Sequence, residues 1–373
     1  MDFAELMGRH AEWMVAKGPS SDIVVTSRVR LARNLTGHPF PGWAARSANA
    51  ESLEKLLPAV EALPGLSPGL SCELAGLGRL EKRVLVERHL ISREHASRSV
   101  GSAVVINASQ SLSVMVNEED HLRLQAMLPG LDLEGALQRV LHLDEALERT
   151  LQFAYDPELG YLTACPSNLG TGLRASAMLH LPGLMLTEDM EKVVQAMNQL
   201  GVAVRGLYGE GSDALGNLFQ VSNQRTLGKA EKDTVQTLDR LVREIIGLEL
   251  LARLRLLEEK RAGLCNQIGR AYGILRFAHR ISSTETLGGL SHLRLASDLG
   301  FFGLDESALV DALMMEIQPA HVQWTLGEKL PEERRDEARA EILRGRLKSL
   351  PAPDMGKVEL QKIHSAVSQH LPE

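Results

Sequence analysis

The sequence has few cysteines and no long apolar segment. Of its 373 residues only three are cysteine, at positions 72, 165 and 265, and this odd, widely spaced set argues against a disulfide framework. No apolar run approaches the ~20 residues that a membrane-spanning helix needs. The acidic segment at residues 1–6 is not followed by the apolar core of a secretory signal peptide. These absences predict a protein of the reducing cytoplasm.

Excess positive charge is also missing. The 41 Lys and Arg residues against 48 Asp and Glu give a formal net charge of -7, so nucleic acid is not the expected partner. No pair of Cys or His residues has the spacing of a zinc site backed by a second pair. The turn at residues 170–172 lacks the lysine and the spacing of a P-loop and is a poor match to a dinucleotide-binding motif. Any bound nucleotide must therefore be held by other side chains.

Apolar periodicity divides the chain near residue 250, and a length of 373 residues suits about two domains. Alternating or short apolar runs predict strands at 22–35, 84–86, 103–107, 111–117, 161–164, 202–205 and 218–222, and helical spacing predicts helices at 48–63, 134–153 and 187–200. Strands that lead into functional loops, with helices packed on one side, indicate an α+β domain around an antiparallel sheet.

The rest of the chain has a purely helical pattern. Between Ala230 and Ala262 there is no proline and a single glycine, and apolar residues recur at helical spacing. Further helices are predicted at 262–280, 285–300, 305–317 and 332–348. The sequence therefore predicts an α+β domain over residues 1–254 followed by an all-helical domain over residues 255–373.

Arginines and glycine-bearing turns recur together. Arg28 and Arg30 lie two residues apart in the first predicted strand, so their side chains share one face. Guanidinium groups bind phosphate bidentately and stay charged at physiological pH, and a polyanion between two of them relieves their repulsion. This pair alone would also fit a surface strand with solvated arginines. Arg123, Arg174 and Arg205, in similar loop-like contexts, favour a phosphate site.

Four segments in this order, 27–30, 117–123, 165–176 and 204–210, resemble the motifs of the ATP:guanidino phosphotransferases, the family of the creatine and arginine kinases. The resemblance to the family covers roughly residues 20–255. A closer resemblance, to its bacterial protein-arginine kinases, covers almost the whole chain. It implies transfer of a phosphoryl group from ATP with Mg²⁺.

The resemblance also implies which residues bind the nucleotide, with the arginines clamping its phosphates. The implied ATP contacts are Ser27, Arg28, Val29, Arg30 and Leu31, then His89 and Arg123, then Arg174, Ala175, Ser176, Ala177 and Met178, and finally Arg205, Gly206, Leu207, Tyr208, Gly209 and Glu210. His89 would form a wall for the base, although a lone histidine is more often structural. Arg225 lies close to the same implied site. Glu118 and Asp120 would approach Mg²⁺ through water, because this ion keeps several of its waters.

The guanidinium side of the reaction needs a different set of groups. A guanidinium is a poor nucleophile, since its pKa exceeds 12, and phosphorylating it requires carboxylates that orient it and accept a proton. The resemblance implies this role for Glu119 and Glu210, and implies that Cys165 is a reactive thiolate tuned by Ser167. The alternatives are solvated surface glutamates and a buried, unreactive cysteine. The glycines around Glu210 predict a loop that closes over substrate.

In the helical domain one further segment resembles a motif of the protein-arginine kinases, which forms an allosteric phosphoarginine pocket there. It consists of Arg335, Asp336, Glu337, Ala338, Arg339 and Ala340. On a helix Arg335 and Arg339 share a face, but the segment also fits a solvated, charged helix surface. The resemblance further implies a homodimer, protein substrates with exposed arginine, an activator of the McsA type and a Clp-type protease.

Arg28 and Arg30 lie close to the start of the sequence. Kinases of small guanidino compounds have a helical domain before the matching arginines, and the residues that precede Arg28 are too few to form it. Together with this departure, the resemblance implies a kinase that phosphorylates arginine side chains of proteins, marks them for degradation and regulates a stress response. One alternative is a kinase of the phosphagen type for a small guanidino compound. The other is a non-catalytic adaptor that binds phosphoarginine, which the full set of arginines and glutamates disfavours.

Overall fold

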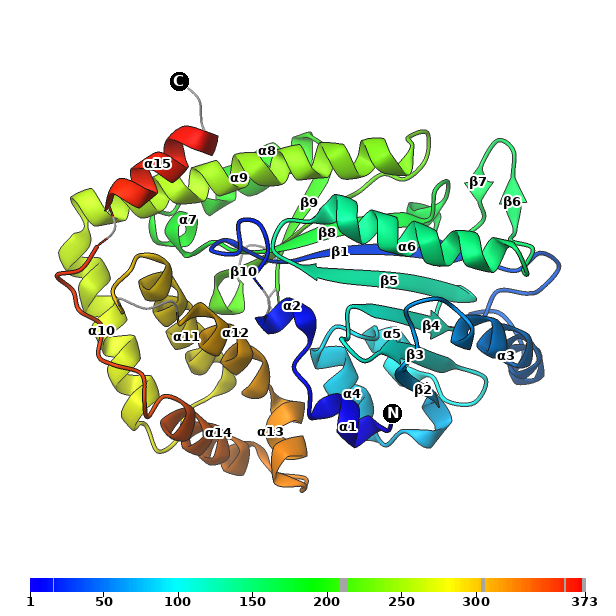
Figure 1. The fold of residues 1–373 in the computed structure, drawn as a ribbon, viewed down its shortest axis with the longest axis horizontal. Coiled ribbons are helices and arrows are strands. Elements are labelled where there is room, and N and C mark those ends of the chain that lie inside the picture. The colour runs from blue at the N-terminus through cyan, green and yellow to red at the C-terminus, as the bar shows by residue number, and fades with distance from the viewer. Residues whose placement is uncertain (16, 208–213, 303–305, 359, 371–373) are drawn as a thin grey trace. The chain divides into compact units, whose positions relative to one another are not determined.

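The computed structural model describes the chain except residues 16, 208–213, 303–305, 359 and 371–373 (Figure 1). The described chain divides into two compact units. Unit 1 comprises Met1–Pro19, Thr26–Ala177 and Ser222–Asp239, and unit 2 comprises Ser20–Val25, Met178–Val221 and Arg240–Glu373. The expected domains 1–254 and 255–373 stay a prediction, because each compact unit is assembled from segments distant in sequence. Within the described residues no helix is long and apolar enough to cross a membrane.

A single large sheet runs through the described fold, and its eight strands are arranged in the order β2-β3-β4-β5-β1-β8-β10-β9. The strands are β1 Val24–Arg33, β2 Gly69–Glu73, β3 Ala103–Asn107, β4 Leu112–Val116, β5 Leu122–Pro129, β8 Leu173–His180, β9 Val202–Gly206 and β10 Leu218–Asn223. The neighbouring pairs β2–β3, β3–β4, β4–β5 and β5–β1 are antiparallel. The predicted α+β fold with an antiparallel sheet is therefore confirmed.

Helices supply the apolar faces that cover the sheet in unit 1. They are α1 Phe3–Met7, α2 Glu12–Val15, α3 Arg46–Glu61, α4 Arg79–Glu87, α5 Arg93–Ser97 and α6 Leu133–Glu148, and a small hairpin adds β6 Tyr155–Asp156 and β7 Gly160–Tyr161. Helix α6 packs along β5 (Figure 1) through buried residues such as Leu137 and Val140. The strand predicted at 84–86 is wrong. Val84 and Leu85 form the buried face of α4, because a short apolar run does not distinguish a strand from a helical turn.

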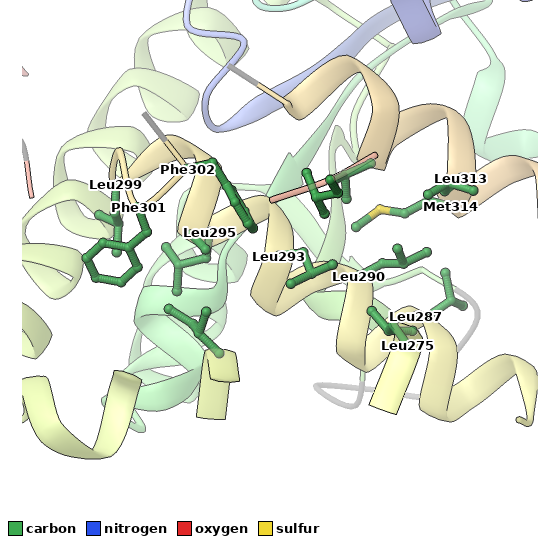
Figure 2. Close-up of a cluster of buried hydrophobic side chains, with 14 of the residues drawn as sticks. Leu275, Leu287, Leu290, Leu293, Leu295, Leu299, Phe301, Phe302, Leu313 and Met314 are labelled. Atoms are coloured by element: carbon green, nitrogen blue, oxygen red, sulfur yellow. The ribbon is translucent and has the colours of Figure 1, made fainter. Parts of the chain in front are cut away.

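Unit 2 contains most of the helical part of the chain. Its helices are α7 Pro182–Leu186, α8 Met190–Gln199, the greater part of α9 Glu231–Glu259, α10 Arg261–Phe277, α11 Ser283–Asp298, α12 Ser307–Glu316, α13 Pro319–Leu326, α14 Glu332–Arg346 and α15 Leu360–His370. The core is built around α11, whose Leu287, Leu290, Leu293 and Leu295 are buried among side chains such as Leu275 and Phe301 (Figure 2). The all-helical pattern predicted after residue 255 is confirmed.

Candidate active site

Arginines converge on one face of the sheet in unit 1. In the register of β1 with β5, Arg28 lies opposite Met127, Arg30 opposite Gln125 and Ala32 opposite Arg123. Directly paired residues of an antiparallel ladder share a face, so Arg123 projects on the same side as Arg28 and Arg30. Arg28 Nε lies 3.4 Å from Ser176 Oγ on β8, where Arg174 is two residues away on the same face. We call Arg28, Arg30, Arg123 and Arg174 the arginine cluster.

Burial and mutual repulsion shape the electrostatics of this cluster. Burial, together with the positive charges of Arg174 and Arg123, lowers the pKa of Arg28 to about 10. The pKa of Arg30 is also lowered well below its ordinary value, first by burial and then by the neighbouring arginines. Arg30 Nε is buried without a hydrogen-bond partner among the described residues. Arginines crowded in this way favour a polyanion such as a polyphosphate, whose oxygens would satisfy several donors at once.

His89 lies beside the cluster, between α4 and α5. Its backbone is in the left-handed region, with φ 58, and its carbonyl accepts a hydrogen bond of 2.8 Å from Gln125 Nε2. Burial, together with Arg28 and Arg30, lowers the pKa of His89 to about 3, so the ring is neutral at physiological pH. The ring centroid of Trp13 is 6.0 Å from that of His89. Sequence reasoning missed Trp13, because a lone aromatic in a short segment belongs to no motif.

The acidic run forms the turn of the β4–β5 hairpin. Asn117 donates its backbone N–H to the His121 carbonyl at 2.9 Å, and Asn117 itself has a positive φ of 56. Its side-chain amide donates to the carbonyls of Asn49 at 2.9 Å and Gly101 at 2.7 Å. Asparagine tolerates this backbone conformation better than most residues. The turn is thereby fixed to α3 and to the loop before β3, which holds the three carboxylates that follow.

Arg123 joins the arginine cluster to these carboxylates. Its Nη1 donates to Glu118 Oε1 at 2.8 Å, and its Nη2 donates to Glu119 Oε2 at 3.1 Å. Glu118 is buried and also accepts from Ser92 Oγ at 2.5 Å. The Glu119 side chain is 42% exposed, and burial of the rest raises its pKa. Glu119 is therefore the carboxylate of this turn that an incoming guanidinium can reach.

The residues expected near magnesium are largely occupied by protein contacts. Asp120 is fully buried, and its Oδ1 accepts from Asn34 Nδ2 at 2.6 Å and from the Ala164 backbone at 2.7 Å. Among the described residues no group of His, Cys, Asp and Glu is arranged to hold a metal ion by itself. Mg²⁺ usually needs one or two carboxylates beside substrate phosphates and waters, and the turn with Glu118 and Glu119 fits that requirement. The metal role of Glu118 and Asp120 stays a prediction.

Cys165 occupies the turn before β8. Its Sγ lies 3.0 Å from Ser167 Oγ, the hydroxyl that the sequence pattern paired with it, and the side chain is partly exposed. The turn Pro166–Asn168 is closed by the Asn168 N–H, which donates to the Cys165 carbonyl at 3.0 Å. Thr226 Oγ1 secures it by donating to the carbonyls of Ser167 and Leu169, at 3.1 and 2.6 Å.

We expect Cys165 to be alkylated at least about tenfold faster than Cys72, because the thiolate is the reactive species. Burial, reinforced by Glu81, raises the pKa of the Cys72 thiol to about 11. Timed iodoacetamide labelling followed by peptide mass spectrometry measures both rates in one sample. ATP with a substrate peptide should slow the labelling of Cys165 alone. Equal rates at both cysteines would contradict an active-site position for Cys165.

Several other expected nucleotide residues have buried side chains. Ser27, Val29 and Leu31 project from the opposite face of β1, and Ser27 Oγ donates to the Gly130 carbonyl at 2.8 Å. Ala175 and Ala177 are likewise buried on β8. Because these side chains are buried in the core, only the backbone at these positions is left to contact a nucleotide. Their place in the nucleotide site stays a prediction.

The last expected segment of the site is incompletely described. Arg205, at the end of β9, is exposed and belongs to unit 2, as do Gly206, Leu207 and Met178. Tyr208, Gly209 and Glu210 lie outside the described residues. Arg225 is exposed in unit 1 beyond the end of β10. The roles implied for these residues, including that of Glu210, stay predictions.

The segment expected to form the phosphoarginine pocket lies on α14. Arg339 is fully buried, and its guanidinium donates to the carbonyls of Ile317 and Ile281, both at 2.9 Å, and to Asp336 at 2.5 Å. Arg335 is partly exposed, and its Nη1 donates to the Leu330 carbonyl at 3.1 Å. Arg339 therefore ties three segments of the helical core together, whereas Arg335 is partly exposed and the Asp336 side chain, bonded to Arg339, is 14% exposed.

Replacing Arg339 by alanine should destabilise the protein by about 3 kcal/mol, because Asp336 and two carbonyls would lose their donor. Replacing Arg335 by alanine should cost at most about 1 kcal/mol, since its side chain is partly exposed. Chemical denaturation of both variants measures the difference. Similar losses in the two variants would show that the buried contacts of Arg339 do not support the fold.

Comparison with known proteins agrees with this arrangement. A family model described as ATP:guanido phosphotransferase, C-terminal catalytic domain, matches residues 53–252, and one described as Protein-arginine kinase McsB C-terminal domain matches residues 261–358. The protein-arginine kinase of Brevibacillus brevis is 45% identical over 91% of this chain and 95% of its own length. That of Halothermothrix orenii is 42% identical over 93% of this chain and 99% of its own.

Solved structures show the same fold. Lombricine kinase superposes with a TM-score of 0.55 at 27% identity, over 64% of this chain and 68% of that chain. The duplicated taurocyamine kinase from Schistosoma mansoni with bound transition state analog components gives a TM-score of 0.57 at 24% identity, over 81% of this chain and 49% of that chain. The chain belongs to the ATP:guanido phosphotransferase family and, within it, to the protein-arginine kinases.

Proposed function

We propose that the protein transfers the γ-phosphoryl group of ATP to arginine side chains of proteins. The observation that carries this proposal is the convergence of the arginine cluster with Glu118 and Glu119, joined by Arg123 on one face of the sheet. The arginines can bind the polyphosphate of ATP, and the neighbouring carboxylate can bind the acceptor guanidinium. The site therefore has groups for both substrates of the reaction. The identity to protein-arginine kinases over more than nine-tenths of the chain supports arginine in proteins as the acceptor.

In this mechanism the protein supplies position and charge. The arginine cluster binds the phosphate oxygens and stabilises the negative charge that spreads over the transferring group. Glu119 orients the acceptor guanidinium and accepts its proton, and Cys165 with Ser167 holds the guanidinium from another side. Mg²⁺, when bound with ATP, neutralises phosphate charge, and the turn with Glu118 and Glu119 would hold it through water. His89 and Trp13 form an uncharged wall suited to a neutral base.

The helical part of the chain would provide recognition and regulation. We propose that the protein works in the cytoplasm as a homodimer, with an activator of the McsA type and a Clp-type protease that degrades the marked proteins under stress. Exposed Ile274 and Phe277 on α10, 40% and 67% exposed, support an association surface within the matched C-terminal domain. The partly exposed Arg335 on α14, with Asp336 beside it, supports a phosphoarginine pocket in which Arg339 would hold Asp336 and the helix from inside.

Mass spectrometry under non-acidic conditions tests the proposed activity. The protein is incubated with ATP, Mg²⁺ and an unfolded protein in the presence of free arginine, and the Glu119→Gln variant serves as the matched control. We expect phosphoarginine in the protein, and much less of it with the variant. Phosphorylation of free arginine alone would instead support a kinase for a small guanidino compound. Binding of phosphoarginine without any transfer would support an adaptor.

A further inference from the structure

A single buried oxygen connects the acidic turn to the segment that carries the thiol. Asp120 directly follows Glu119, and its Oδ1 accepts a hydrogen bond of 2.7 Å from the backbone N–H of Ala164. Ala164 directly precedes Cys165. The same Oδ1 accepts from Asn34 Nδ2 at 2.6 Å. The residues next to Glu119 and next to Cys165 are therefore joined through one atom, which lies away from solvent.

Asn34 completes this connection from the end of β1. Its Nδ2 also donates to the Leu162 carbonyl at 3.0 Å, and its Oδ1 accepts from the His121 backbone N–H and lies within hydrogen-bond distance of His121 Nδ1, both at 2.9 Å. The side chain of Asn34 is thus bonded on both sides, to residues 120–121 and to residue 162. We call Asn34 and Asp120, with these hydrogen bonds, the Asn34–Asp120 brace.

Burial makes the brace a demanding element of the fold. Asn34 is 1% exposed and Asp120 is 0% exposed, and Asp120 Oδ2 has no hydrogen-bond partner among the described residues. A buried carboxylate with one unpaired oxygen lowers the stability of the fold, and an apolar residue would pack better at this position. The hydrogen bonds that offset this cost join the acidic turn to the segment before Cys165, and they set the distance between these two loops. Other hydrogen bonds fix each loop separately, whereas the brace bonds the two loops to each other.

We propose that Asn34 and Asp120 are positioning residues that hold Cys165 and Glu119 at the spacing required to grip one guanidinium between them. The inference rests on the proposed function for the roles of Cys165 and Glu119. It differs from the expected role of Asp120 near Mg²⁺, because the atom in question faces Ala164 and Asn34 instead of an ion. Displacing a reacting group by about 1 Å can cost roughly 10²-fold in rate, so the brace is expected to influence turnover strongly.

Two variants of the full-length protein test the brace. Asn34→Asp removes the donor to Asp120 and Leu162 and places two carboxylates together. Asp120→Asn keeps an oxygen that accepts from both Asn34 and Ala164. Asn107→Asp, at a buried asparagine between β3 and β4 that bonds to Ser111 and Leu112, is the matched control.

Turnover on a protein substrate, the ATP dissociation constant, the Mg²⁺ concentration for half-maximal activity and the alkylation rate of Cys165 are measured for each variant. We expect Asn34→Asp to lower kcat by about 10- to 100-fold and to change the alkylation of Cys165, with ATP binding unaltered. Asp120→Asn should retain more turnover than Asn34→Asp, because its amide oxygen still accepts from Asn34 and Ala164, and its Mg²⁺ requirement should match that of the wild type. Asn107→Asp should match the wild type.

Several results would overturn the inference. Wild-type turnover and wild-type thiol labelling in Asn34→Asp would show that the brace positions nothing. Turnover in Asp120→Asn as low as in Asn34→Asp, or a higher Mg²⁺ requirement in Asp120→Asn, would also contradict the inference. Asn34→Ala replaces Asn34→Asp if circular dichroism shows that the latter is unfolded. If the wild type phosphorylates no arginine, the proposed function fails, while the labelling rates of Cys165 still decide whether the brace holds the thiol segment.

Discussion

Replacement of Glu119 by glutamine should lower the turnover of arginine phosphorylation by about 10²–10⁴-fold, the usual contribution of a general base. Glutamine has nearly the same shape and can still accept a hydrogen bond from Arg123, but it loses the negative charge that holds a guanidinium and the capacity to take its proton. Burial raises the pKa of Glu119, which makes it a better proton acceptor than a solvated glutamate. Steady-state kinetics with a protein substrate measure the effect.

ATP binding separates this effect from a general loss of structure. Glu119→Gln replaces no arginine of the cluster, and Arg123 keeps its hydrogen bond to Glu118, so the ATP dissociation constant measured by calorimetry should remain close to that of the wild type. The exposed Glu94 on α5 provides a matched control, because Glu94→Gln makes the same chemical change away from the site. Near wild-type turnover in Glu119→Gln, with the protein folded, would remove Glu119 from the catalytic set.

Replacement of Arg30 by methionine should have opposite effects on activity and on stability. The loss of a guanidinium that stabilises the transferring phosphoryl group is expected to lower kcat/KM for ATP by about 10³-fold, as for other arginines in this role. Without nucleotide, however, Arg30 is buried among like charges, and its pKa is held well below the ordinary value. Methionine fills similar volume without a charge, so the free protein should melt at a higher temperature than the wild type.

Thermal denaturation with and without ATP measures both effects. The wild type should gain stability on adding ATP, because a ligand that binds the folded state raises the melting temperature. Arg30→Met should begin from a higher melting temperature and gain little. The exposed Arg79 on α4 gives the matched control, and Arg79→Met should respond to ATP as the wild type does. A lower melting temperature for free Arg30→Met would show that the cluster is not under electrostatic strain.

The sequence and the structure agree best where a local pattern is enough. Alternation along a strand predicts that Arg28 and Arg30 share one face, and the burial pattern of β1 bears this out. Helical spacing found α3, α6, α9 and the helices after residue 255 for the same reason. The order of the short motifs identified the family, which the relatives confirm. Each of these inferences depends on residues only a few positions apart.

Patterns that depend on distant partners were not found. Strands β5 and β8 carry Arg123 and Arg174, yet sequence reasoning recognised neither, because nearly every residue of these central strands is buried and alternation is lost. Conversely, Val84 and Leu85 looked like a strand and belong to a helix. The side chain of Asp120, expected to approach Mg²⁺ through water, accepts hydrogen bonds from Asn34 and Ala164, and no local pattern indicates these two partners.

The sequence by itself determined the family, the fold class and the residue types that the chemistry needs, because these depend on motifs and local periodicity. The tertiary structure alone decided which of those side chains meet. It placed Arg123 between the arginine cluster and Glu119, sent Arg339 into the helical core while Arg335 stayed accessible, and joined the thiol segment to the acidic turn through Asp120. Burial and hydrogen bonding between segments far apart in sequence decide where each of these side chains points, and a local sequence pattern does not contain that information.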